Sequence, residues 1–103
     1  METLKIGHYD YDVKVVDGLQ FGDDYVNGLC RPDSKEILLS SKLNEQYHKG
    51  VLMHEVLHGL FAESGLSDRL EEGLEEEFVI LLGNSLHGFL ENNIERIHEM
   101  YKN

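Results

Sequence analysis

The sequence predicts an α+β fold, because strand patterns fill roughly its first forty residues and helical patterns fill the rest. β-Branched residues cluster over residues 11–16, and turn formers follow them. No proline occurs after Ser40, and apolar residues there recur at helical spacing. With 103 residues, 41% of them hydrophobic, the chain is long enough for one modest core. We therefore expect one domain spanning residues 1–103.

Three strands are expected, over residues 11–16, 25–30 and 36–40, with residues 4–6 as an outer extension of the first. Asp and Gly residues between the first two strands indicate turns. The run Pro32-Asp33-Ser34 predicts a hairpin loop, because Pro presets a turn φ angle and the short polar side chains bond nearby backbone. The simplest product is a small, about three-stranded, mostly antiparallel sheet.

Two long helices and a short one are expected after the strands. The first runs over residues 44–63, with Asn44 as a cap and Gly65 as the C-terminal stop. The second is expected to start near Ser67 or Asp68, with an acidic first turn. The Asn92-Asn93 pair suggests a break, which would leave a short final helix over residues 94–101.

The charge balance restricts the function classes. Twenty acidic residues against nine basic ones give a net charge of −11, which disfavours nucleic-acid binding and suits basic partners. The lone Cys30 cannot form an internal disulfide and is typical of a reducing cytosol. No apolar run has signal-peptide or membrane-spanning length, so we expect a cytoplasmic protein without a membrane segment.

The run His54-Glu55-Val56-Leu57-His58 predicts a zinc site. Residues four apart on a helix project from one face, so a single ion can reach both imidazoles. Glu55 lies one residue round the helix and can act as general base toward a water whose pKa the zinc lowers. Two histidines and a glutamate inside an apolar helix would also be costly to bury without a partner.

A third ligand is needed, because catalytic zinc normally takes three protein ligands and leaves one position open. The second helix offers only carboxylates for this role near its start. Glu76 points away from the apolar stripe of that helix, whereas Glu75 and Glu77 both lie beside it, and spacing does not separate these two. The candidates are Glu71, Glu72, Glu75, Glu76 and Glu77, and the stripe is Leu74, Phe78, Leu81 and Leu82.

Residues 51–66, which include the histidine motif, and the run Glu76-Glu77-Phe78-Val79 together resemble the small zincin-like proteins of phages and prophages that are related to ImmA/IrrE-type metallopeptidases. The likeness covers about residues 25–93. It implies that Glu77 completes the zinc site. It also implies a minimal zincin fold, in which a short sheet packs on the active-site helix and a substrate peptide extends an edge strand.

The expected function is therefore a zinc-dependent hydrolase of the metallopeptidase type, acting on a peptide or protein in the cytoplasm of a bacterial host, with Glu55 as general base. The alternative is a non-catalytic, zinc-stabilised interaction protein of phage or prophage origin whose acidic surface binds a basic partner. Asn84 is a candidate partner for a ligand histidine. Tyr25, Tyr47 and His87 are candidates for stabilising an oxyanion, and their spacing does not distinguish them.

Overall fold

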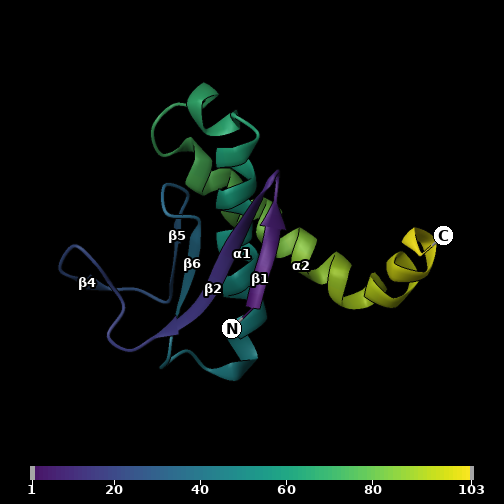
Figure 1. The fold of residues 1–103 in the computed structure, drawn as a ribbon, viewed down its shortest axis with the longest axis horizontal. Coiled ribbons are helices and arrows are strands. Elements are labelled where there is room, and N and C mark those ends of the chain that lie inside the picture. Colours follow the sequence, from purple (N-terminus) through teal and green to yellow (C-terminus); the bar gives the residue numbers. More distant parts are fainter. Residues whose placement is uncertain (1, 103) are drawn as a thin grey trace.

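The computed structural model describes residues 2–102 and has an α+β fold, as the sequence predicts. A mostly antiparallel sheet precedes two long helices, and a short 3-10 helix, η1, connects them (Figure 1). In chain order the elements are β1 (Glu2–Ile6), β2 (Tyr9–Val16), β3 (Gln20–Phe21), β4 (Asp24–Tyr25), β5 (Gly28–Arg31), β6 (Glu36–Ser40), α1 (Glu45–Glu63), η1 (Leu66–Arg69) and α2 (Leu74–Tyr101).

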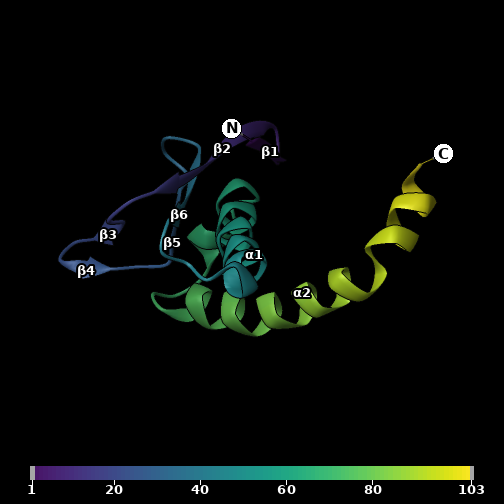
Figure 2. The ribbon, with the colours of Figure 1, turned by 90° about the horizontal axis from the view of Figure 1, so that it is seen from below.

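Helix α1 lies between two layers. Figure 2 shows the strands on one side of α1 and the first half of α2 on the other. The strands bury their inner faces against α1, and the fully buried side chains include Tyr11, Ile37 and Leu39. Apolar side chains of α1, among them Val51 and Val56, pack against this cluster. The histidine motif therefore lies on the central element of the molecule.

The main sheet has four strands rather than the three expected, in the order β1-β2-β6-β5. The pairs β1/β2 and β5/β6 are antiparallel, but β2 and β6 run parallel, with Val13 opposite Ile37. The chain can make this parallel pair because the long connection through β3, β4 and β5 returns it to the starting end of β2. Strands β1 and β5 form the two edges, and β5 borders the histidine motif.

The strand expected over residues 25–30 is divided in the structure. Its first residue, Tyr25, belongs to β4, which pairs with β3 in a separate two-stranded ribbon. Only Gly28–Arg31 joins the main sheet as β5. The expected hairpin loop is present between β5 and β6, where Lys35 closes the turn with a φ of 58°.

Helix α1 closely matches its prediction. Asn44 caps it, because its side-chain oxygen accepts a hydrogen bond from the backbone N–H of Gln46 at 2.8 Å. Gly65, with a φ of 83°, takes the left-handed conformation that ends a helix at little steric cost. The helix consequently spans Glu45–Glu63.

Helix α2 differs from its prediction at both ends. Ser67 and Asp68 lie in η1, and α2 starts only at Leu74, because Gly73 takes a left-handed φ of 86° that no α-helix contains. The break predicted at Asn92-Asn93 was wrong, since α2 continues to Tyr101 and contains the short helix expected over residues 94–101. Within residues 2–102, neither helix combines the length and apolar character needed to cross a bilayer.

Candidate metal centre

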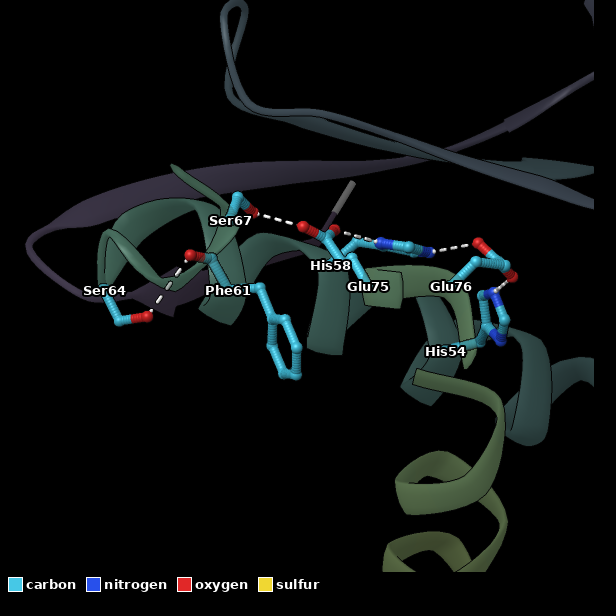
Figure 3. A network of polar contacts seen from close by, with 7 residues as sticks. All are labelled: His54, His58, Phe61, Ser64, Ser67, Glu75 and Glu76. Atoms are coloured by element: carbon cyan, nitrogen blue, oxygen red, sulfur yellow. Dashed lines mark hydrogen bonds and ion pairs between the residues drawn. The ribbon is translucent and has the colours of Figure 1, made fainter. Parts of the chain in front are cut away.

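The two histidines of the motif meet one carboxylate from α2. His54 Nε2 lies 2.8 Å from one oxygen of Glu76, and His58 Nε2 lies 2.9 Å from the other (Figure 3). The histidines stand four residues apart on α1, which brings their ring centroids to 5.1 Å. One possible ligand atom from each of the three residues lies within 4.8 Å of the others. Two nitrogens and one oxygen are thus gathered at one point.

Glu77, the third ligand that the resemblance implies, is exposed and lies outside this group of donor atoms. Glu76 faces the two histidines instead, because the face of α2 that packs on α1 is centred on Val79 and Gly83. Glu76 lies one turn before Val79 and so points along that face. The stripe used to orient α2 from the sequence is largely solvent-exposed, with Phe78, Leu81 and Leu82 at 39%, 65% and 50% exposure.

Glu75 also contacts the site, from the opposite side of His58. Its carboxylate accepts a hydrogen bond from His58 Nδ1 at 2.6 Å and a second, short one from the Ser67 hydroxyl on η1. Figure 3 shows Glu75 and Glu76 on either side of the His58 ring. The sequence offered Glu75 only as a rival metal ligand, and the contact with Ser67 was missed because no pattern links η1 to α2.

Glu55, the expected general base, is buried between α1 and β5. Its exposure is 8%, and its side chain lies against Gly28, where an added Cβ would come within 3.1 Å of the carboxylate. Burial raises the pKa of the Glu55 carboxyl above its ordinary value. The two histidines oppose this rise in pKa, and the charge of Glu76 adds to it. The sequence placed Glu55 correctly beside the histidines, but it did not indicate that Gly28 lies against Glu55.

Two hollows lie beside the motif, and the walls of both include His54, Glu55 and Gly28, the first residue of β5. The larger, of about 500 Å³, is lined further by polar side chains of α1 and α2. The smaller hollow, of about 340 Å³, is lined by Glu75 and Glu76. Three residues weighed from the sequence, Tyr47, Asn84 and His87, line the larger hollow, whereas Tyr25 lines a separate one beside Ser40.

Cys30 lines the smaller hollow as a half-buried free thiol. Burial raises the pKa of this thiol to about 12, and the charges of Glu55 and Glu75 contribute to the rise. Cys30 is therefore protonated at neutral pH and is a poor nucleophile there.

No protein-family model, curated protein or solved structure matches this chain. What the chain does must therefore be inferred from the chemistry of the site. That chemistry consists of two imidazoles and a carboxylate that face one another, a buried carboxylate beside them, and an open hollow on each side.

Proposed function

We propose that the chain is a zinc-dependent hydrolase of the metallopeptidase type, with His54, His58 and Glu76 as the metal ligands and Glu55 as the general base. The observation that carries this proposal is the convergence of the three donor side chains within 4.8 Å. The proposal keeps both histidines and Glu55 from the sequence prediction, and it replaces Glu77 by Glu76.

The donor set suits zinc. Two imidazole nitrogens and one carboxylate oxygen are a ligand set found in catalytic zinc sites, which keep a further position open. His54 and His58 each aim the same ring nitrogen, Nε2, at Glu76, so small side-chain rotations would turn all three donors toward one ion. When bound, zinc would polarise a substrate carbonyl and lower the pKa of a water molecule.

Glu55 is suited to take up the proton of the attacking water. It directly follows His54 in the chain and borders both hollows, so its carboxylate lies at the point where a substrate and water would meet. A raised pKa makes a carboxylate a better proton acceptor near neutral pH, and burial acts on Glu55 in this direction. The residue would then pass the proton to the leaving amine.

We propose that a peptide substrate lies along β5. Among residues 2–102 this strand is an edge of the sheet and pairs only with β6, so its other side can accept an additional extended strand. Both hollows border β5, which would place the scissile bond beside His54 and Glu55. This arrangement, together with the histidine motif, supports the relationship to a minimal zincin that the sequence resemblance implies.

A second function is a metal-stabilised interaction protein without catalysis. The observation that favours it is that the three donors come only from α1 and α2, so a bound ion would join these helices. The excess of acidic residues would then attract a basic partner.

Replacing Glu55 by Gln tests the catalytic proposal. We expect Glu55→Gln to bind zinc as the wild type does, because Glu55 is not among the ligands. Hydrolysis of casein or of a fluorogenic peptide library should fall about 100-fold or more, as loss of a general base predicts. Glu76→Ala should lose the metal. Glu77→Ala, which changes the neighbouring exposed residue, should keep both zinc binding and hydrolysis.

Three outcomes would contradict these assignments. A wild type without bound zinc rules out the metal centre. Unchanged hydrolysis in Glu55→Gln shows that Glu55 is not the base. A zinc-loaded wild type that cleaves none of the peptides, and that unfolds when a chelator removes the metal, favours the interaction protein.

A further inference from the structure

The carboxylate of Glu75 connects three elements of the fold. It belongs to the first turn of α2, and one of its oxygens accepts the hydrogen bond of His58 Nδ1 on α1 at 2.6 Å. Its other oxygen accepts the hydroxyl of Ser67 on η1 (Figure 3). With 25% side-chain exposure, Glu75 is also less exposed than Glu76, at 52%. Both oxygens of Glu75 are thus engaged at the back of His58.

A histidine can give a metal only a ring nitrogen that carries no proton. A hydrogen-bond acceptor at Nδ1 holds the proton on that nitrogen. The lone pair of Nε2 is then free to bind the metal. In this chain carboxylates lie at both ring nitrogens of His58, with Glu75 2.6 Å from Nδ1 and Glu76 2.9 Å from Nε2. With Nε2 and Glu76 both bound to a metal ion, Glu75 would be the carboxylate left to accept the Nδ1 proton. The hydrogen bond also limits rotation of the ring, so it sets the direction of the Nε2 lone pair.

We propose that Glu75 is a positioning residue, which orients His58 toward the metal and is itself held by Ser67. This inference rests on the proposed metal centre. It separates the adjacent glutamates by role, with Glu76 as a ligand and Glu75 acting through His58. The η1 segment thereby supports the site through Glu75, which accepts the hydrogen bond of Ser67.

Direct ligation by Glu75 is the competing interpretation, and the geometry disfavours it. The contact of Glu75 with His58 is at Nδ1, whereas the three donor atoms gather at the Nε2 side of the ring. To reach the metal, Glu75 would have to leave both His58 and Ser67. Glu76 needs only a small rotation, because its two oxygens already lie 2.8 Å from His54 Nε2 and 2.9 Å from His58 Nε2.

The test measures zinc affinity in Glu75→Gln, Glu75→Ala and Ser67→Ala, by competition with a chromophoric chelator. Glu75→Ala should bind zinc about 10- to 100-fold more weakly than the wild type while keeping the same stoichiometry, as the loss of such a partner predicts. Glu75→Gln should recover part of this loss, because its amide oxygen can still accept the Nδ1 proton. Ser67→Ala should show a smaller loss, and Glu77→Ala should match the wild type.

The visible spectrum of the Co²⁺ form distinguishes a positioning residue from a ligand. Glu75→Gln should keep the wild-type band intensities, since the coordinating atoms are unchanged, whereas Glu76→Gln should alter them. Unchanged zinc affinity in Glu75→Ala would overturn the proposal. A Glu75→Gln variant with an altered Co²⁺ spectrum would also overturn it, by making Glu75 a ligand.

Two controls distinguish loss of positioning by Glu75 from other causes of weaker zinc binding. Circular dichroism shows whether Glu75→Ala has lost its fold, in which case Glu75→Gln and Ser67→Ala decide the result. A wild type that binds neither zinc nor Co²⁺ would refute the metal centre itself and this inference with it. A wild type that binds zinc with an affinity that Glu75→Ala leaves unchanged would refute only the role of Glu75.

Discussion

Gly28 is a point of close approach between the sheet and the helix that carries the histidine motif. A Cβ at this position would lie 2.8 Å from Val51 Cγ1 and 3.1 Å from the Cγ and a carboxylate oxygen of Glu55. Such distances are shorter than ordinary contacts, so a side chain here would force α1 and β5 apart. The absence of a side chain at Gly28 therefore allows Glu55 to be buried beside the two hollows.

Gly28→Ala should destabilise the protein and displace Glu55. We expect a loss of about 1–3 kcal/mol in the free energy of unfolding, the usual cost of overpacking, measured by urea denaturation. Gly88→Ala is the matched control, because a Cβ there would meet open space within a helix and should stabilise by about 0.5–1 kcal/mol. Equal stabilities for wild type and Gly28→Ala would show that the close contact is absent in solution.

The site residues differ in how far the sequence determines them. His54, Glu55 and His58 follow from spacing within one helix, because the period of the helix alone sets which side chains share a face. Which glutamate of α2 faces the two histidines depends on how α2 is rotated against α1. That rotation follows from Val79 and Gly83, which pack on α1, and not from the larger apolar residues that suggested Glu75 or Glu77.

At the scale of elements, a polar cluster joins the end of α1 to the first hairpin. One oxygen of Glu63 on α1 accepts hydrogen bonds from the Tyr11 hydroxyl on β2 and from Lys35 in the β5–β6 turn. Tyr11 is fully buried in the main core. The pKa of the Glu63 carboxyl is lowered, mainly by the hydrogen bond from Lys35 and next by the one from Tyr11. The pKa of the Tyr11 hydroxyl is raised, mainly by burial and next by its hydrogen bond to Glu63.

These two pKa shifts predict a loss of stability at both ends of the pH range. Glu63, with a lowered folded pKa, stabilises above its ordinary value of 4.5, and this contribution disappears as the pH falls through the folded pKa. Tyr11, with a raised folded pKa, stabilises below its ordinary value of 10.0, and this contribution disappears as the pH rises above it. Urea unfolding of the wild type should therefore show both declines.

Single variants separate the two declines. In Glu63→Gln the stability difference from the wild type should shrink as the pH falls below about 4.5, and in Tyr11→Phe it should shrink as the pH rises above about 10. Tyr101→Phe, at a residue that is 85% exposed, is the control for the alkaline decline. A difference that is constant with pH would mean that the cluster does not titrate as described.

Element boundaries were predictable where a local signal sets them, as with Asn44 and Gly65 around α1. The start of α2 was missed because the signal is Gly73 in a left-handed conformation, and glycine is compatible with several roles. The break at Asn92-Asn93 was wrong because asparagine disfavours a helix only weakly. Asn93 instead satisfies its amide within α2, by donating to the Phe89 carbonyl at 2.9 Å.

At the scale of the whole molecule, the second half of α2 extends beyond the layered body. Figure 2 shows the C-terminal end of this helix leaving the strands and α1 behind. Its apolar side chains are correspondingly exposed, with Ile94 at 53%, Met100 at 69% and Tyr101 at 85%. This projecting part has little packing to hold it in a helix.

Hydrogen exchange should divide α2 into two parts. Amides of residues 94–101 should exchange much faster than those of residues 79–90, because local opening is easiest where few side chains are buried. Amides of α1 serve as the internal reference for the body. Equal protection along all of α2 would contradict this expectation and would indicate that the projecting part is covered in solution.

The sequence predicted the fold class and the order of elements, but not how the strands pair. Hydrophobic patterns locate strands one at a time, and they carry no information on which strand lies beside which. Three strands, β3, β4 and β5, separate β2 and β6 in the chain, and nothing in the patterns of β2 and β6 indicated that these two strands pair in parallel. The β3–β4 ribbon was missed because each strand has only two residues.

The proposed ligands lie close together along the chain, since His58 and Glu76 are 18 positions apart. An ion held between them would act as a cross-link that closes a short loop. Closing a loop of about 15 residues by a disulfide removes about 3 kcal/mol of chain entropy from the unfolded ensemble. A partly unfolded state that kept the ion would lose entropy in the same way. The single cysteine of this chain cannot form an internal disulfide. The metal would then serve as a stabilising cross-link as well as a catalytic cofactor.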